Sequence, residues 1–454
     1  MKKHFVIVAY LFLTFGLNNT QAQWTTVCNS GNGFIDNLDT FQNKLITTGF
    51  YTTLCSNNVN YVSQYDGTSW LPMGTGFTEA GHHLFNYNQT LHAVTYQPAI
   101  DSNWVWVWNG SQFEKKGEGV YLSNAVIGFS QTANLYYVTN YNGNLVACGE
   151  FDRVGNKNIS GIMQWNGTSW DSLGAGLSGS LPGGATVMYP HCMTVMGNDL
   201  IVAGNFKLAG TQTVNGIARW DGTAWHAMGA GFNGTVYAVS MFQGELYAGG
   251  AFTQSGSTPL SCLAKWNGTA WVDPGFKTFY NDVSAYSFIH TLKEIKGNLF
   301  FAGGFDRIVF NSDTLQCQAI GAFTGTTMDT LFGGLPGFEV EGIAYYQGGL
   351  YASGGSNNSN SYIARYQGPL GVEGISENNN ALRIYPNPSH GSIHVHSKTR
   401  ITEIIVFNAV GQTIEHHYPN ANQADLDLKE PGNYWIQVIS NEKRITKRVQ
   451  IERN

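Results

Sequence analysis

An all-β fold is predicted for this chain of 454 residues by its composition and by two recurring sequence patterns. Charged residues make up 12% of the chain, aromatic residues 13%, and 55 residues are glycine, which suits strands and tight turns better than long amphipathic helices. The string WNGTSWDSLGAGL, residues 165–177, recurs with small changes, and so does a short apolar segment that ends in glycine. The spacing of about 50 residues is typical of β-propeller blades.

Residues 1–22 have the features of a secretory signal peptide. Lys2 and Lys3 precede an apolar run from Phe5 to Leu17, and a small-residue cleavage site, Thr20-Gln21-Ala22, follows. The apolar run is too short for a permanent anchor, and no later stretch has the roughly 18 apolar residues that a membrane helix needs. We therefore expect a mature chain that starts near Gln23, leaves the cytoplasm and has no transmembrane segment.

Each repeat is predicted to contain four strands, placed by two markers. One marker is an apolar strand in which a glycine follows a leucine by four residues. It lies about 20 residues before the other marker, which is an aromatic residue at a turn. The repeat with Leu91 is the exception, because Thr95 stands where the glycine is expected. A further short apolar strand precedes the one with the leucine and the glycine. The aromatic marker comes before an Asn-Gly, Asp-Gly or similar step: Tyr65, Trp108, Trp165, Trp220, Trp266, Phe323 and Tyr366.

The Asn-Gly step predicts an outer hairpin with a two-residue type I′ turn, because this pair adopts positive φ readily. Trp165 and Trp170 would then lie on the paired strands of one hairpin and supply apolar area between neighbouring blades. The last repeat lacks a fourth strand, since Pro369 follows soon after Tyr366. We expect the segment from Trp24 to Phe34 to supply it and so to close the ring without an open sheet edge.

The predicted domain is therefore a seven-bladed β-propeller over residues 23–368, closed by its N-terminal strand. The degenerate second and sixth repeats leave six or eight blades as alternatives. The W-[ND]-G-[TS]-x-W units resemble those of kelch-related propellers and of surface propellers in bacteria. This resemblance implies the fold and carries no catalytic residues with it.

A second domain is predicted at residues 381–454, after a polar linker at 369–380. Its short alternating strands predict a small β-sandwich, and the segment resembles the type A C-terminal sorting domain of the type IX secretion system of Bacteroidota. That resemblance implies the secretion machinery as a partner and a secreted or cell-surface location reached across the outer membrane. It leaves open whether the protein is released or attached. The residues that carry it are Tyr385, Pro386, Asn387, Pro388, Gly391, Gly411, Gly432 and Tyr434.

A candidate ligand site emerges when the first strands are aligned on the leucine of the following strand. Seven residues before that leucine every repeat has an apolar residue, and nine residues before it every repeat has a polar one, which predicts a polar ring near the mouth of the central channel. Three histidines of the ring, His82, His191 and His290, could bind a transition metal. A solvated channel would equally need a polar lining. The ring consists of Asp36, His82, Tyr136, His191, Tyr237, His290 and Glu341.

Several function classes are disfavoured. The sequence contains no HExxH, G-x-S-x-G, Walker or EF-hand motif. Acidic residues outnumber basic ones in residues 1–375, which disfavours nucleic acid binding. The six cysteines are dispersed and lack the CxxC spacing of zinc sites, and the sequence leaves their disulfide pairing open. We favour a non-enzymatic binding or adhesion module for a glycan or a protein, because the loops are short. The alternatives are a propeller-type polysaccharide lyase or hydrolase that uses the histidine-lined channel, and a structural coat protein.

Overall fold

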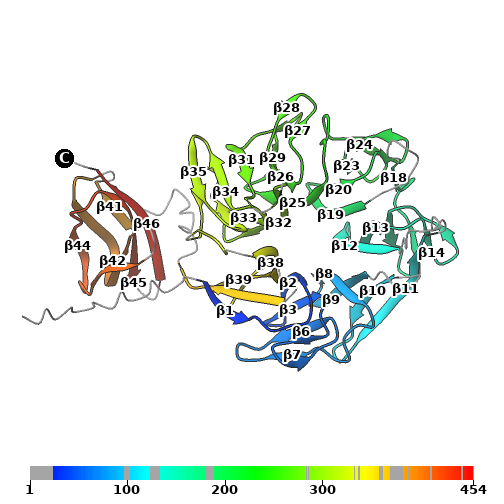
Figure 1. The fold of residues 1–454 in the computed structure, drawn as a ribbon, viewed down its shortest axis with the longest axis horizontal. Coiled ribbons are helices and arrows are strands. Elements are labelled where there is room, and N and C mark those ends of the chain that lie inside the picture. The colour runs from blue at the N-terminus through cyan, green and yellow to red at the C-terminus, as the bar shows by residue number, and fades with distance from the viewer. Residues whose placement is uncertain are drawn as a thin grey trace, which may run out of the picture.

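The computed structural model describes residues 24–96, 103–122, 133–179, 189–282, 284, 286–331, 333–335, 338–368 without 357–360, 382–386, 389–408, 412–440 and 443–452. All regular elements in these ranges are β-strands, arranged as small sheets around a common centre with the C-terminal strands to one side (Figure 1). The chain is therefore all-β, with a propeller-like arrangement of sheets. The predicted signal peptide (1–22) and linker (369–380) lie outside the described residues.

Antiparallel sheets repeat along the chain, each built from an inner strand, two middle strands and an outer strand. The inner strands are β2 (Ile35–Phe41), β8 (Ala80–Tyr87), β12 (Asn134–Tyr141), β19 (Tyr189–Met196), β25 (Val236–Phe242), β32 (Phe288–Ile295) and β38 (Phe338–Tyr346). The second strands are β3 (Lys44–Gly49), β9 (Thr90–Tyr96), β13 (Asn144–Glu150), β20 (Asp199–Asn205), β26 (Glu245–Gly250), β33 (Asn298–Gly304) and β39 (Gly349–Ser356). The third strands are β6 (Val62–Tyr65), β10 (Asn103–Trp108), β16 (Ile162–Trp165), β23 (Ile217–Trp220), β29 (Leu263–Trp266), β36 (Ile320–Phe323) and β40 (Ser361–Tyr366). The outer strands are β7 (Trp70–Pro72), β11 (Phe113–Tyr121), β17 (Trp170–Ser172), β24 (Trp225–Ala227), β30 (Trp271–Val272), β37 (Met328–Asp329) and β1 (Trp24–Cys28).

The first described strand lies in the same sheet as the last strands of the repeats. β1 pairs with β40, so that Trp24 lies opposite Tyr366, and the Trp24 indole donates a hydrogen bond to the Leu331 carbonyl of the preceding repeat at 3.2 Å. A disulfide joins Cys28 to Cys55, a pairing that the sequence left open. The remaining cysteines, Cys148, Cys192, Cys262 and Cys317, are buried and free.

Short hairpins between the second and third strands link adjacent sheets. In three places a hairpin strand pairs with a strand of the preceding repeat: β14 pairs with β11, β21 pairs with β18, and β34 pairs with β31. Backbone hydrogen bonds therefore cross from one repeat to the next in addition to the apolar contacts. The strands concerned are β4 (Thr53–Leu54), β5 (Asn57–Asn58), β14 (Arg153–Val154), β15 (Lys157–Asn158), β18 (Leu177–Ser178), β21 (Leu208–Ala209), β22 (Gln212–Thr213), β27 (Gln254–Ser255), β28 (Thr258–Pro259), β31 (Phe276–Tyr280), β34 (Arg307–Phe310) and β35 (Asp313–Gln316).

The outer hairpin differs from the predicted type I′ turn. Trp165 pairs with Trp170, so the connection has four residues rather than two. Asn166 Oδ1 accepts hydrogen bonds from the backbone N–H groups of Thr168 and Ser169, both at 2.9 Å, and from the Thr168 hydroxyl at 3.0 Å. Of the turn residues only Gly167 has a positive φ, of 106°. The two-residue prediction was wrong because the asparagine side chain caps a longer turn.

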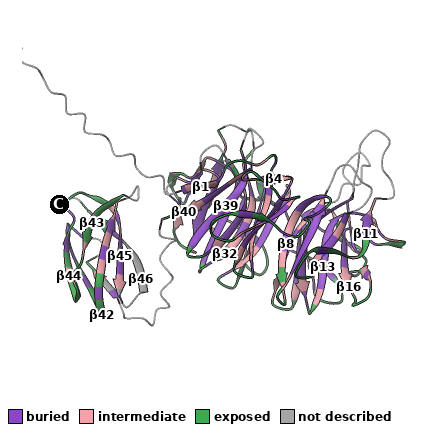
Figure 2. Ribbon diagram, turned by 90° about the horizontal axis from the view of Figure 1, so that it is seen from below, coloured by how far each residue is buried: buried purple, intermediate pink, exposed green. Residues whose placement is uncertain are grey.

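Tryptophans of the outer hairpins pack against the neighbouring sheet. The Trp165 and Trp170 rings lie 5.2 Å apart, and the Trp170 indole donates to the Lys116 carbonyl of the preceding repeat at 2.9 Å. The Trp271 indole donates in the same way to the Met228 carbonyl at 3.1 Å. Buried residues run along the strand interiors in Figure 2, so the apolar core lies within and between the sheets.

The C-terminal strands surround the long strand β42. The first half of β42 pairs with β41 and β44, and its second half pairs with β43 and β45, which in turn pairs with β46. An apolar cluster that includes Ile393, Ile404 and Ile436 fills this unit; a two-layered sandwich remains a prediction. The strands are β41 (Leu382–Tyr385), β42 (Ser392–Phe407), β43 (Thr413–His417), β44 (Ala421–Asp427), β45 (Gly432–Ser440) and β46 (Lys443–Ile451).

The residues of the predicted sorting signal fall at turns and strand ends of this unit. Tyr385 ends β41 and its ring is half-exposed, whereas Tyr434 is buried and donates a hydrogen bond to the Glu430 carbonyl at 2.7 Å. Gly391 has a φ of 127° before β42, and Pro386 follows Tyr385. Gly432 begins β45, while Asn387, Pro388 and Gly411 lie outside the described residues.

Candidate functional site

An irregularity in strand pairing occurs at the same place in all seven inner strands. The pairing of each inner strand with the second strand skips one residue. A β-bulge of this kind leaves the extra residue unpaired and redirects its side chain. The skipped residues are Asp36, His82, Tyr136, His191, Tyr237, His290 and Glu341. They are the polar ring that the sequence alignment selected, called the bulge ring below.

The glycine marker of the second strand is explained by the same bulge. A Cβ atom added to Gly204 would lie 2.0 Å from the Tyr189 carbonyl oxygen, and one added to Gly149 would lie 2.0 Å from that of Asn134. Equivalent contacts occur at the glycines of the other repeats that have this marker. The bulge presses a carbonyl of the inner strand against the second strand, and only glycine leaves room for it. The two sequence patterns are therefore two sides of one structural feature.

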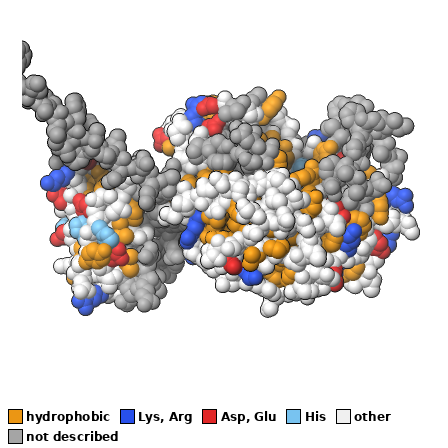
Figure 3. All heavy atoms as spheres, turned by 60° about the horizontal axis from the view of Figure 1, so that its bottom comes forward, with side chains coloured by type: hydrophobic (Ala, Val, Ile, Leu, Met, Phe, Trp, Pro, Cys, Tyr) orange, Lys and Arg blue, Asp and Glu red, His pale blue; other side chains and the backbone are white. Residues whose placement is uncertain are grey.

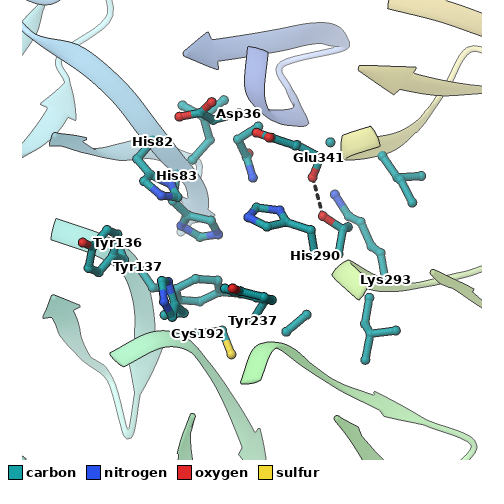
Figure 4. A pocket seen from close by; sticks show the side chains of 18 of the residues that line it. Asp36, His82, His83, Tyr136, Tyr137, Cys192, Tyr237, His290, Lys293 and Glu341 are labelled. Carbon is teal, nitrogen blue, oxygen red and sulfur yellow. Dashed lines mark hydrogen bonds between the residues drawn. The ribbon is translucent and has the colours of Figure 1, made fainter. Parts of the chain in front are cut away.

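All seven residues of the bulge ring line one cavity of about 210 Å³ between the inner strands (Figure 4). The residues that follow them in the chain, among them His83, Tyr137 and Cys192, line it too. Period-2 alternation would send neighbouring residues to opposite faces of a strand, whereas residues on both sides of a bulge can face the same side. The structure thus brings the whole predicted site together and adds a second layer to it.

Aromatic side chains follow one another around the cavity. The His82 ring lies 5.5 Å from that of Tyr136, and the Tyr136 ring lies 4.9 Å from that of His191. The Tyr237 ring in turn lies 5.2 Å from His191 and 5.6 Å from His290. Tilted and edge-to-face contacts at these distances are favourable and rigid. Imidazole and phenol side chains therefore alternate over five consecutive inner strands.

Two carboxyl groups occupy the remaining positions of the bulge ring. Asp36 on β2 and Glu341 on β38 both line the cavity, and the charge of Glu341 acts on Asp36. Burial, together with the neighbouring Glu341 charge, raises the pKa of Asp36 well above its usual range. Thr291 donates a hydrogen bond to the Glu341 backbone carbonyl, which helps to hold that strand in place (Figure 4). This pair is called the carboxyl pair below.

Histidines at the cavity are held in the neutral form. Desolvation, with a smaller effect of His290, lowers the pKa of His82 to about 4. Desolvation likewise lowers the pKa of His191 to about 3, with smaller effects of His290 and His82, and the pKa of His83 falls well below its usual value. At neutral pH these side chains are uncharged hydrogen-bonding groups rather than cations.

Other residues that line the cavity form an ion pair and a stacked ring pair. Lys293 Nζ lies 3.2 Å from Asp39 Oδ1, and the His83 ring stacks on Tyr137 at 3.8 Å. The Nδ1 atoms of His83 and His290 are buried and have no hydrogen-bond partner among the described residues. Almost all buried polar atoms in proteins are paired, so these two atoms are exceptions next to the cavity.

Glu150 is a further acidic residue near the bulge ring that the sequence analysis missed. It is buried and lies directly after the marker glycine Gly149, where the other repeats have no acidic residue. Desolvation raises the pKa of Glu150 to about 7, against the opposing effect of hydrogen bonds with Asn134 and Tyr136. The sequence did contain a signal for this residue, because Glu150 is the only acidic residue that directly follows a marker glycine.

Acidification is expected to destabilise the protein through these histidines. Because the pKa of His191 is about 3 in the fold and 6.5 when unperturbed, the unfolded chain binds a proton between these values that the folded chain does not. The free energy of unfolding should fall as the pH drops below 6.5. Between pH 7 and pH 5 the loss from this one residue should be about 1–2 kcal/mol.

The measurement is chemical denaturation of the wild-type protein and of His191→Gln across this pH range. The variant should lose less stability than the wild type on acidification. His226→Gln is the control, since His226 pairs with Asp221 on an outer hairpin away from the cavity. Equal pH dependence of the wild type and His191→Gln would contradict the assignment.

The three predicted metal ligands line the same cavity. His82, His191 and His290 project from β8, β19 and β32. Within the ranges that the structure describes, no three His, Cys, Asp or Glu side chains are placed so that they could hold a metal ion.

On the face drawn in Figure 3, lysine and arginine side chains are dispersed rather than gathered. The described part of the chain also contains no helix with the length and apolar character needed to cross a membrane.

The C-terminal unit matches a known family. Residues 383–452 match the model of the secretion system C-terminal sorting domain. The protein is therefore exported by the type IX secretion system and is associated with the cell surface or outer membrane. A search of curated proteins found no match to the chain.

Solved structures similar to this chain include three bacterial or archaeal proteins. PorZ, a surface component of the type IX secretion system of Porphyromonas gingivalis, is 10% identical with a TM-score of 0.35, over 92% of this chain and 70% of its own. The extracellular domain of BT4673 from B. thetaiotaomicron is 11% identical with a TM-score of 0.42, over 94% of this chain and 58% of its own. The β-propeller domain of the Trilobed protease from Pyrococcus furiosus is 7% identical with a TM-score of 0.40, over 75% of this chain and 94% of its own. Similarity this low says nothing of activity or ligand.

Proposed function

We propose that this exported protein is a non-enzymatic surface binding module whose central cavity takes the end of a glycan. Its body, residues 23–368, would be a seven-bladed β-propeller closed by the N-terminal strand, joined through the linker 369–380 to the sorting domain at 381–454. The observation that carries the proposal is the convergence of seven bulged polar residues on one cavity. Bulges are often found next to functional sites, where they redirect side chains.

Support for the closed propeller comes from the contacts of the inner strands. Each of them contacts the next one along the chain, and β38 contacts β2 as well as β32. The pairing of β1 with β40 supplies the fourth strand that the last repeat lacks. A ring of sheets closed in this way surrounds a central channel, where the bulge ring would form the mouth.

Support for a glycan comes from the size and lining of the cavity. At about 210 Å³ it is smaller than the roughly 300–1,000 Å³ pockets that hold drug-sized ligands, so it suits a single terminal group. Alternating imidazole and phenol groups offer both ring faces and hydrogen-bonding atoms. A protein partner, the alternative for a binding module, would have to insert one side chain or rest on the rim.

The enzyme alternative fits this cavity less well. A lyase needs a general base whose pKa lies near the working pH. With a pKa of about 4, His82 is a weak base, and Glu150, whose pKa is about 7, is not among the residues that line the cavity. These features favour binding over bond cleavage.

The test is binding of the mature protein to an array of glycans that end in neutral, acidic and amino sugars. His82→Ala, His191→Ala and His290→Ala should each weaken binding about tenfold or more, since each removes a ring contact and a hydrogen-bonding group. His226→Ala should bind like the wild type. Thermal unfolding would verify that the variants are folded. Unchanged binding in all three cavity variants, or glycan fragments released by the wild type, would refute the proposal.

A further inference from the structure

The charges around the cavity are unbalanced at the carboxyl pair. The lining residues that carry a charge are Asp36, Asp39, Lys293 and Glu341, and Lys293 pairs with Asp39. His82 and His191 are neutral, as their lowered pKa values require. Among the described lining residues no lysine or arginine therefore remains to pair with the carboxyl pair, although buried carboxylates usually have a counter-charge.

Another acidic group near the carboxyl pair reinforces this imbalance. The charge of Glu341 acts on Glu339, whose pKa is raised by burial and by that neighbour. A cation that enters the cavity would relieve the repulsion that Glu341 exerts on Asp36.

Two independent features indicate that the missing group is an organic cation. Asp36 and Glu341 supply carboxylate oxygens that no lysine or arginine among the described lining residues neutralises. The rings of Tyr136 and Tyr237 add aromatic faces, which attract cations. A primary ammonium group has three N–H donors and so matches two carboxyl groups better than a quaternary ammonium, which has none.

We propose that the cavity binds a protonated primary amine carried on a sugar ring, with the ammonium group donating hydrogen bonds to Asp36 and Glu341. This inference rests on the proposed glycan-binding function and names its ligand class as amino sugars with a free amine. The phenol and imidazole groups of the aromatic series would contact the ring and its hydroxyl groups. An acetylated amine has no charge and so cannot relieve the repulsion between the two carboxyl groups.

The experiment is calorimetric titration of the mature protein with glucosamine, N-acetylglucosamine and glucose, at a pH at which the free amine is protonated. Glucosamine should bind at least about tenfold more tightly than the two neutral sugars, since hydrogen bonds to charged groups are the strong ones. Asp36→Asn and Glu341→Gln should each reduce glucosamine binding to the level of glucose. Asp313→Asn, in the exposed hairpin strand β35, is the matched control and should bind normally.

The outcomes separate this inference from the proposed function. Equal binding of glucosamine and glucose, or glucosamine binding that survives both Asp36→Asn and Glu341→Gln, would overturn the inference while glycan binding stands. Lysine amide that binds as tightly as glucosamine would overturn the assignment to a sugar. Failure of the glycan array to respond to the histidine variants would refute the proposed function itself. Thermal unfolding of the Asp36 and Glu341 variants verifies that they are folded.

Discussion

Replacing Trp170 by alanine should lower the free energy of unfolding by about 3–5 kcal/mol, the usual cost of removing a fully buried large aromatic side chain. The Trp170 ring is completely buried between two sheets and contacts Trp165 at 5.2 Å. Its indole N–H also satisfies the Lys116 carbonyl of the preceding repeat. The variant would therefore leave both a cavity and an unpaired carbonyl at a contact between repeats.

Urea denaturation of the wild type, Trp170→Ala and Trp170→Phe measures this effect. Trp170→Phe keeps most of the apolar area and loses only the indole hydrogen bond, so its loss should be about 1–2 kcal/mol. A loss in Trp170→Ala no larger than that in Trp170→Phe would contradict the view that packing between the sheets dominates at this position.

Much of the site could be predicted from the sequence because the repeats share one register. Aligning the first strands on a leucine selected every member of the bulge ring, although those residues range from Asp36 to Glu341 along the chain. A single repeat would not have revealed the pattern, since one polar residue in a short strand is unremarkable. The repeated comparison supplied the signal.

The second layer of the cavity was missed because strand alternation was assumed. A regular strand would turn His83 and Tyr137 away from the face that carries His82 and Tyr136. The bulge places all four around one cavity. The glycine marker was visible in the sequence, but its connection with the bulge was not. That connection depends on the close approach of Gly204 to the Tyr189 carbonyl, which lies on the neighbouring strand.

The sequence could not predict the turn at Asn166 or test the metal hypothesis, for two different physical reasons. Asn-Gly favours a type I′ turn on backbone grounds, but the Asn166 side chain binds two backbone N–H groups and stabilises a longer turn. Metal ligation depends on distances across the cavity, which no spacing along the chain specifies. His82, His191 and His290 share the cavity, where the lowered pKa values of His82 and His191 keep these two side chains neutral.

Replacing Gly204 by alanine should cost about 3 kcal/mol and also weaken ligand binding. The added Cβ atom would lie 2.0 Å from the Tyr189 carbonyl oxygen, 2.6 Å from Pro190 Cα and 2.8 Å from the His191 backbone nitrogen. All three atoms belong to the backbone, so the clash cannot be relieved by a side-chain rotation. The inner strand must move away, and the bulge that directs His191 into the cavity must change with it.

Gly268→Ala is the matched control for this prediction, because Gly268 has a positive φ of 99° and nothing within 4 Å of an added Cβ atom. It should lose only the roughly 1 kcal/mol that left-handed backbone costs alanine, and its ligand affinity should stay unchanged. Denaturation and glycan titration of both variants separate the two effects. If Gly204→Ala resembled Gly268→Ala in both measurements, the glycine would not be needed to hold the bulge, and the link between the glycine marker and the bulge ring would fail.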